Sequence, residues 1–250
     1  MSLSVIVITF NEEMNIGACL QSVEWADELI VVDSKSSDKT VEIAKTYTDK
    51  VVITDWFGYA ENKRIALSQA SCEWVFWLDA DERVSPELKE EIIELLAANP
   101  PQNGFQIKRK AFFLGKWIKH CGWYPGYVLR LFRRQHGDLN NKRVHEGLEI
   151  AGEIGQSKHA LLHYTDHILD HYLSKFNRYT TLAANEMAQK GQHTNIVEMC
   201  FRSLFAFIKM YFFKLGILDG SKGFMLCLLS SGYVMCKYAK LWEIQKQNRS

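Results

Sequence analysis

The 250-residue sequence lacks the features that mark several common classes of protein. Its net charge is only +1, so no strong field favours nucleic acid as a partner. Its six cysteines are scattered without a Cys-x-x-Cys pair, which argues against a disulfide framework or a zinc site and favours reduced thiols in a cytosolic protein. Residues 1–4 carry no basic region and lead directly into a predicted strand, so we expect no secretory signal peptide.

Long apolar runs and two nucleotide-binding motifs are also absent. The longest uncharged apolar stretch, residues 223–236, is shorter than the roughly 20 residues that span a bilayer. No Gly-x-Gly-x-x-Gly follows the first predicted strand, which argues against a dinucleotide enzyme. No Gly-x-x-x-x-Gly-Lys-Ser/Thr is present, which argues against a P-loop. The sequence does contain 47% hydrophobic residues, enough to fill a real core.

Strands and helices are predicted to alternate over the first hundred residues. Short apolar runs, rich in β-branched residues, predict buried strands. Ser85-Pro86-Glu87 is a strong helix start, with an N-cap, a proline at the first helical position and an acid in the first turn. The alternation predicts a parallel sheet with helices on both faces. The predicted strands are 5–8, 29–32, 51–53 and 74–78, and the predicted helices are 15–23, 39–46, 59–70 and 85–98.

Two carboxylates one residue apart directly follow the fourth predicted strand. Asp79 and Asp81 therefore stand at the carboxyl end of a strand, where open α/β sheets bind their ligands. Two hard oxygen donors suit Mg²⁺ or Mn²⁺, with substrate phosphates completing the coordination shell. The alternative interpretation is that an Asp after a strand simply caps the next helix.

Four motifs, each at a strand end, resemble the inverting family 2 glycosyltransferases. The resemblance covers roughly the first hundred residues, and it implies the GT-A fold: an α/β, Rossmann-like, mostly parallel sheet with flanking helices. The motifs are Ser4 to Glu12, Ile30 to Ser34 with Ser36, Asp38 and Thr40, Asn62-Lys63-Arg64 before Ala66, and Leu78 to Glu82.

The resemblance implies a role in nucleotide-sugar binding for each matching residue. The alternative for each one is a polar loop residue that caps a helix. A divalent ion on the diphosphate would neutralise the charge of the leaving group. The implied roles are Thr9, Asn11 and Glu12 against the base and ribose, Asp33 on the base or ribose, Lys63 near the phosphates or base, and Asp79 and Asp81, with Ala80 between them, on the ribose and the metal.

Residues 104–165 differ in composition from the first hundred residues and contain the predicted general base. Inverting transfer needs a general base for the acceptor hydroxyl, on the face opposite the leaving group. The resemblance places Glu146 at this position, with His145 as the second candidate, either as base or as a further metal ligand. The alternative for Glu146 is a surface salt bridge to Arg143. Arg130, on a strand predicted at 127–134, faces either the diphosphate, an anionic acceptor or solvent.

Two further side-chain groups in the second half leave alternatives open. The aromatic residues Trp117, Trp123, Tyr124 and Tyr127 form either a sugar-stacking platform or part of the core or a lid. The histidines at 163, 167 and 171 are spaced to share one face of a helix, as a metal stripe or as solvated or core residues.

The C-terminal region is apolar and basic. From Asp166 onward the chain has 11 Lys/Arg against 6 Asp/Glu, whereas the preceding residues have 19 against 23. Two apolar helices are predicted, one from Asn195 and one from 224 to 241, separated by a break at 218–223. They either pack on the catalytic domain or another subunit, or lie in a membrane interface with their cations on anionic lipid.

This region, together with Val144-His145-Glu146, resembles the lipopolysaccharide inner-core β-1,4-glucosyltransferases within family 2. The resemblance implies a UDP-sugar donor, UDP-glucose, and a lipid-anchored heptose acceptor at the cytoplasmic face of the inner membrane. The alternatives are a family 2 transferase with another lipid-linked or polysaccharide acceptor, and a catalytically weak glycan-binding protein. The expected domains are 1–165, with a nucleotide-sugar half at 1–100 and an acceptor half at 101–165, and a helical region at 166–250.

Overall fold

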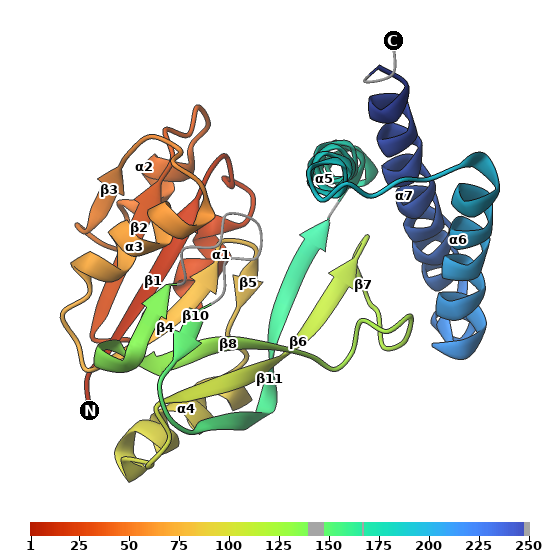
Figure 1. Ribbon diagram of the computed structural model, residues 1–250. Helices are drawn as coiled ribbons and strands as arrows, with labels where there is room; N and C mark the ends of the chain where they lie inside the picture. The colour runs from red at the N-terminus through yellow and green to blue at the C-terminus, as the bar shows by residue number, and fades with distance from the viewer. Residues whose placement is uncertain (140–147, 167, 248–250) are drawn as a thin grey trace. The chain divides into compact units, whose positions relative to one another are not determined.

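The computed structural model describes residues 1–139, 148–166 and 168–247, which form two compact units (Figure 1). The first unit comprises Met1–Lys110 and Gly126–His163, and the second Ala111–Pro125 and Tyr164–Ser250. Of the three boundaries, two fall inside long strands, β6 (Gly104–Phe113) and β11 (Ile154–Asp166), and the third falls between Pro125 and Gly126. Residues 111–125 thus belong to the compact C-terminal unit, and the division at residue 165 stays a prediction about functional organisation.

The first unit is built on the predicted parallel strands. In the order β3-β2-β1-β4, β1 (Leu3–Thr9) lies between β2 (Glu28–Asp33) and β4 (Trp74–Asp79), and β3 (Val51–Ile53) pairs with β2, all in parallel. Thr9 lies opposite Asp33, and Ile8 lies opposite Asp79. The carboxyl ends of three strands therefore meet at one edge of the sheet.

Helices cover both faces of this sheet, as predicted. Alternate residues of β1 point to opposite faces, so Val5 and Val7 join one buried cluster and Ile6 joins another. The first cluster includes side chains of α1 (Ile16–Gln21), α2 (Thr40–Ala44) and α4 (Pro86–Ala98). The second includes Ala66 of α3 (Tyr59–Gln69). Near-continuous apolar strands are what a sheet buried on both faces requires.

Helix α4 begins as its sequence predicts. The Ser85 hydroxyl accepts a hydrogen bond from the Leu88 backbone N–H at 3.3 Å, and Pro86 occupies the first helical position. The helix ends at Asn99, whose φ of 47° lies in the left-handed region that stops a helix.

Antiparallel strands extend the sheet beyond β4, in the order β4-β8-β6-β11-β5. The strand β8 (Gly126–Arg133) runs antiparallel to both β4 and β6, and β5 (Glu82–Arg83) runs antiparallel to β11 with Glu82 opposite His163. A separate ribbon pairs β9 (Gly137–Leu139) with β10 (Leu148–Ile150), after the short turn η1 (Arg134–His136). This arrangement brings β8 and β11 side chains to the β4–β5 turn.

One carboxylate ties together the amino ends of the parallel strands. Glu28, at the start of β2, accepts hydrogen bonds from Ser4 of β1, from Lys50 just before β3 and from Ser71 shortly before β4. Burial acts to raise the pKa of Glu28, but the bonds from Lys50, Ser4 and Ser71 outweigh it and lower the pKa from 4.5 to about 2. The ionised form is therefore strongly preferred in the folded protein.

Replacing Glu28 by Gln is expected to lower the free energy of unfolding at pH 7 by about 3 kcal/mol, because the pKa falls from 4.5 to about 2 on folding and each pKa unit corresponds to about 1.4 kcal/mol. Because the folded pKa is depressed, this contribution is present above pH 4.5 and is lost as the pH falls towards 2. Urea denaturation at pH 7 and at pH 3 measures the difference, which we expect to shrink at pH 3. Glu90→Gln on the exposed face of α4 is the control, and equal effects of the two substitutions at pH 7 would contradict the prediction.

The second unit is mostly helical. It contains the hairpin strand β7 (Lys116–Trp117), the helices α5 (Leu169–Gln189), α6 (Ile196–Ile208) and α7 (Gly220–Gln247), a π-helical turn η2 (Lys209–Phe213) and a 3₁₀ turn η3 (Gly216–Asp219). Its core includes Phe113, Ile118, Cys121, Leu226 and Cys227. None of its described helices, nor any other in the described residues, is long and apolar enough to span a bilayer.

The predicted pair of apolar helices is confirmed, but the break predicted at 218–223 lies earlier, at η2 and η3, and α7 already begins at Gly220. Asn195 caps α6 by accepting from the Glu198 N–H at 2.9 Å. The break is tightly packed, because a Cβ on Gly216 would lie 2.8 Å from both the Cys121 and the Cys227 sulfur. The predicted histidine helix face is wrong: His163 lies on β11, α5 begins only at Leu169, and residue 167 lies outside the described residues.

Candidate active site

Polar side chains gather at the carboxyl edge of the parallel strands. Thr9 ends β1, Asp33 ends β2 and Asp79 ends β4, and strand register places them side by side. The buried Thr9 hydroxyl has no hydrogen-bond partner within the described parts of the chain. A sheet edge of this kind is where α/β proteins bind their ligands.

The loops after β1 and β2 are hydrogen bonded to each other. The Asn11 side-chain oxygen accepts from the Ser37 N–H at 2.8 Å, and the Asn11 N–H donates to the Ser36 hydroxyl at 2.8 Å. The Glu12 N–H donates to the Thr40 hydroxyl at 2.8 Å. Asn11 has a φ of 53°, a conformation that Asn tolerates better than most residues. The two loops thus form one surface, which includes both Asn11 and Glu12.

The buried side chains of Asp33 and Asn62 form hydrogen bonds to the loop after β2. The Asp33 carboxylate is buried and accepts from the Ser36 N–H at 2.8 Å. Asn62, fully buried on α3, donates to the Ser34 hydroxyl at 2.9 Å and accepts from the Phe57 N–H at 3.0 Å. The neighbouring Lys63 ammonium lies 3.7 Å from the centroid of the Trp77 ring, close to β4.

Three charged side chains form a network at the Asp79–Asp81 turn, in which Arg130 and Glu82 are buried and Asp79 is partly exposed. Arg130 of β8 donates to the Asp79 carboxylate and, at 2.7 Å, to Glu82 Oε1. The second Glu82 oxygen accepts from the Asp79 backbone N–H at 3.0 Å. Arg109 of β6 adds a longer contact to Glu82 at 3.7 Å. The Glu82 side chain is 0% exposed, so its bonds to these partners offset the free energy lost when the carboxylate is removed from water.

The network shifts the pKa values of its two acids, Asp79 and Glu82, in opposite directions. Burial acts to raise the pKa of Asp79, but Arg130 and Lys63 outweigh it and hold the pKa at about 2. Burial also raises the pKa of Glu82, and although Arg130 lowers it, the nearby charge of Asp79 adds to the rise. Burial opposes the charged form of Arg130, yet Asp79 and Glu82 raise its pKa above the ordinary value. Asp79 and Arg130 are therefore charged at neutral pH.

Asp81 pairs with a histidine of β11, the strand that pairs with β5. His163 Nε2 lies 3.3 Å from Asp81 Oδ2, and both side chains are 15% exposed. The other ring nitrogen of His163 is buried without a hydrogen-bond partner in the described residues. Ala80 between the two aspartates is buried in the core of the first unit.

The donor set fits a hard divalent cation. Asp79 and Asp81 each use Oδ2 in the ion pairs described above, and carboxylate oxygens are the ligands that Mg²⁺ and Mn²⁺ prefer. Among the residues that the structure describes, no three acidic, histidine or cysteine side chains converge on one point. A cation here would thus need substrate oxygens or water as further ligands. Mg²⁺ is commonly bound in this way, by one or two carboxylates together with substrate phosphates.

The predicted base lies outside the described residues. His145 and Glu146 fall in residues 140–147, so the structure does not test their roles. The nearest described residues on either side, Leu139 and Leu148, pair with each other in the β9–β10 ribbon.

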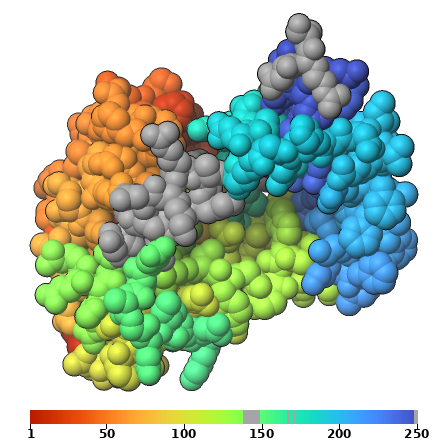
Figure 2. Space-filling model, in the orientation of Figure 1, coloured from red at the N-terminus to blue at the C-terminus, as the bar shows by residue number. Residues whose placement is uncertain are grey.

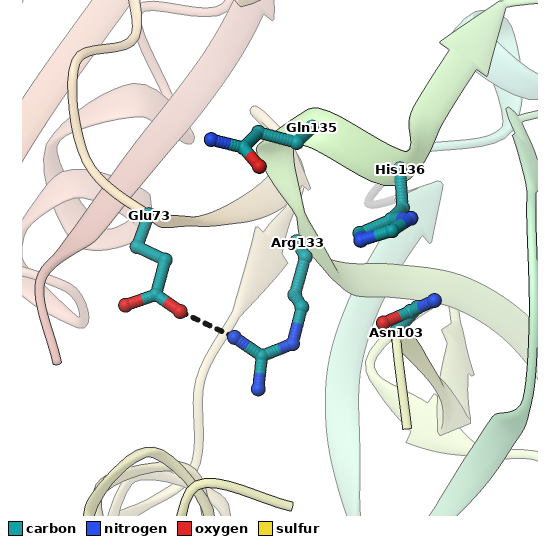
Figure 3. A pocket seen from close by; sticks show the side chains of 5 residues that line it. All are labelled: Glu73, Asn103, Arg133, Gln135 and His136. Carbon is teal, nitrogen blue, oxygen red and sulfur yellow. Dashed lines mark hydrogen bonds and ion pairs between the residues drawn. The ribbon is translucent and has the colours of Figure 1, made fainter. Parts of the chain in front are cut away.

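A pocket in the first unit lies away from this edge. Figure 3 shows Glu73, Asn103, Arg133, Gln135 and His136 around it, with Arg133 ion-paired to Glu73. Glu73 directly precedes β4, whereas Asp79 ends that strand. A six-residue strand spans about 20 Å, so the pocket is at the opposite end of β4 from the aspartates.

Sequence reasoning missed two members of the site. Glu82 stands in the same motif as Asp79 and Asp81, but nothing in the motif indicates that it is buried beneath them. For His163, the four-residue spacing to the next two histidines indicates a helix, whereas the residue lies on β11. The aromatic residues Trp117 and Tyr124 pack edge to face at 5.4 Å, and Trp123 packs on the buried Phe113 at 6.4 Å, while a sugar platform stays a prediction.

Comparison with known proteins identifies the family. The model of glycosyl transferase family 2 matches residues 4–145, more than half of the chain. The chain is also 33% identical to the lipopolysaccharide core biosynthesis glycosyltransferase LpsC of Rhizobium meliloti, over 96% of this chain and 92% of that protein. An uncharacterized glycosyltransferase of Rickettsia typhi is 27% identical over 99% of this chain and 89% of its own length. The chain belongs to glycosyltransferase family 2, and it is a glycosyltransferase.

Solved structures agree on the fold. Glucosyl-3-phosphoglycerate synthase from Mycobacterium tuberculosis, solved with Mn²⁺, UDP and glucosyl-3-phosphoglycerate, superposes with a TM-score of 0.50. The match covers 78% of this chain and 81% of that chain at 18% sequence identity. The predicted GT-A fold is thereby confirmed.

Proposed function

We propose that this enzyme transfers glucose from UDP-glucose to a heptose of a lipopolysaccharide or lipooligosaccharide core, with inversion at the anomeric carbon. The observation that carries the proposal is the Asp79–Asp81 turn at the sheet edge beside Thr9 and Asp33. The similarity to LpsC along 96% of the chain supports a core acceptor. The acceptor would be anchored in lipid, which implies action at the cytoplasmic face of the inner membrane.

The nucleotide half of the site would bind the donor. Thr9, Asn11, Glu12 and Asp33 would contact the base and ribose of UDP, and Lys63 would approach the phosphates. A divalent cation, Mg²⁺ or Mn²⁺, held by Asp79 and Asp81 would neutralise the charge that develops on the departing diphosphate. The Mn²⁺ and UDP bound by glucosyl-3-phosphoglycerate synthase are consistent with this assignment. Arg130 would fix the Asp79 carboxylate rather than contact the donor, because it already bonds both Asp79 and Glu82.

A residue of this chain would also accept the proton of the acceptor hydroxyl. The acceptor hydroxyl oxygen attacks the anomeric carbon while its proton passes to the Glu146 carboxylate. The bond between that carbon and the diphosphate oxygen breaks, and its electron pair leaves with UDP. The product is a glycosidic bond of inverted configuration. His145 is the alternative base.

The test is transfer of labelled sugar by the purified protein. With Mn²⁺ or Mg²⁺ and a core lipopolysaccharide that ends in heptose, we expect UDP-glucose to be the preferred donor over UDP-galactose, UDP-N-acetylglucosamine and GDP-mannose. Glu146→Gln is expected to reduce transfer by about 10²–10⁴-fold while UDP affinity is kept, because only the base is removed.

Glu153→Gln, an exposed substitution of the same chemistry, is the control and should transfer normally. Normal turnover by Glu146→Gln would remove the base assignment. A preference for another donor, or transfer only to a different acceptor, would overturn the proposed specificity while leaving the enzyme class intact.

A further inference from the structure

The second unit exposes an unusual number of large apolar side chains on α6, on the turn after it and on α7. Figure 2 shows the side chains of α6 and this turn, in the lighter blue, at the surface of the molecule. We call these side chains the apolar strip. It consists of Val197, Phe201, Leu204, Phe205, Phe212, Phe213, Leu215, Ile217, Leu218, Phe224, Leu228, Met235 and Trp242.

Helix α6 has its apolar face outward. Val197, Phe201 and Leu204 recur at helical spacing and are all exposed, as is Phe205, which stacks on Phe201. Its contact with α7 includes a buried polar pair, in which the Ser203 hydroxyl bonds Ser231 at 2.9 Å, and an aromatic contact, between Phe207 and Phe224 at 5.8 Å. A helix on the surface of a globular protein normally has the reverse pattern. The outward face of α6 is thus suited to an apolar environment.

The turn between α6 and α7 has the same character. Phe212 and Phe213 are exposed, Phe213 to 74%, and three aliphatic residues of the next five positions are also exposed. On α7, exposed Phe224, Leu228, Met235 and Trp242 recur at intervals that place them on one helical face. Phe224 also packs on Tyr211 of the turn at 5.7 Å, which joins the surfaces of the two helices.

The charges around the strip are almost all positive. Residues 197–242, which span the strip, contain six Lys/Arg and two acidic residues, Glu198 and Asp219. Glu198 is ion-paired with Arg202 on the same helix. Asp219 is only 2% exposed, and its carboxylate is occupied by the backbone N–H groups of Lys119 and His120. Lys209 and Lys214 lie exposed on either side of the two phenylalanines. The surface around the strip therefore has an excess of cations, with Glu198 neutralised by Arg202 and Asp219 buried.

We propose that the apolar strip inserts into the headgroup layer of a membrane that contains anionic phospholipid, with Lys209 and Lys214 on lipid phosphates. This inference rests on the proposed function, which requires a lipid-anchored acceptor, and it names the surface that meets the lipid. Aromatic side chains favour the membrane–water interface, and cations near it are attracted to anionic leaflets. An amphipathic surface with basic residues beside aromatic ones is typical of interfacial binding. A surface for a protein partner with an ordinary mixed rim would lack this one-sided charge.

The experiment measures sedimentation of the full-length protein with vesicles. We expect binding to vesicles of phosphatidylethanolamine with phosphatidylglycerol and little binding to phosphatidylcholine alone. Phe212→Ser/Phe213→Ser should weaken binding at least about tenfold through lost apolar burial. Lys209→Glu/Lys214→Glu should weaken it about tenfold or more at low salt, and less in about 0.5 M NaCl, where charge interactions are screened.

Matched controls remove similar groups elsewhere. Leu182→Ser/Ile93→Ser removes exposed apolar side chains on α5 and α4, and Lys45→Glu/Lys158→Glu makes the same change in net charge. Both controls should bind vesicles as the unchanged protein does. Hydrolysis of UDP-glucose in solution should be the same in all variants, which shows that they are folded.

Three results would overturn the inference. The first is that the unchanged protein fails to sediment with anionic vesicles. The second is that the controls lose as much binding as the strip variants. The third is a dimer that Phe212→Ser/Phe213→Ser separates without any effect on vesicles, which would make the strip a contact between copies. If vesicles bind the strip but no nucleotide sugar is consumed, the proposed function fails and the surface assignment stands.

Discussion

Replacing Arg130 with Met is expected to lower the free energy of unfolding by about 3–5 kcal/mol, the cost of removing one partner from a buried ion pair. The reason is Glu82, which is completely buried and would lose its 2.7 Å bond to the guanidinium. Asp79 would lose its partner at the same time. We also expect glycosyl transfer to be largely lost, since Asp79 would no longer be fixed. Chemical denaturation and initial rates measure the two effects.

A second substitution separates the two effects. Glu82→Gln keeps an oxygen for the Asp79 N–H but removes the buried charge, so the double variant Arg130→Met/Glu82→Gln should recover much of the lost stability. It should not recover transfer. Additive losses of stability in the double variant would contradict the buried-charge explanation.

Replacing Asp81 with Asn is expected to reduce transfer by at least about 10²–10³-fold, as for the removal of one group that stabilises developing negative charge. The protein should remain folded, because Asp81 is held only by His163 in the described structure. Initial rates over a series of Mn²⁺ concentrations should show that more metal is needed for the residual activity.

Two controls distinguish a metal role from a structural one. Asp55→Asn removes an exposed carboxylate that pairs with Lys35 on the surface, and such pairs contribute little. His163→Gln removes the other half of the Asp81 pair. If His163→Gln and Asp81→Asn reduce activity equally and without any change in metal dependence, Asp81 serves the ion pair and not the cation.

The parallel half of the fold could be predicted because its signals are local. The runs at 5–8, 29–32 and 74–78 lie in the interior of the sheet and are mostly buried, so each strand appears as a continuous apolar segment. The run at 51–53 forms the edge strand and is only partly buried. The antiparallel half gave weaker signals. Most of β11 mixes polar and apolar residues, and its pairing with β5 joins residues far apart in the sequence, such as Glu82 and His163.

The candidate site divides in the same way. Asp33, Asp79 and Asp81 could be found because each follows a strand that the sequence predicts. The role of Glu82 as the buried partner of Arg130 could not be predicted, because it depends on where β8 places the Arg130 side chain. Arg130 itself was predicted to face the diphosphate, an anionic acceptor or solvent, whereas its described bonds are to Asp79 and Glu82. Glu146 stays a prediction.

The hydrogen bonds between the loops after β1 and β2 have a consequence for donor affinity. Asn11, Glu12, Ser36, Ser37 and Thr40 bind one another within the chain. In the proposed enzyme a nucleotide would meet a surface whose backbone is already fixed, so little conformational entropy would be lost on binding. Differences in affinity between nucleotide donors would then arise from direct contacts with the base and sugar rather than from loop ordering. Selection for a new donor would act on side chains at this surface while the loop framework is kept.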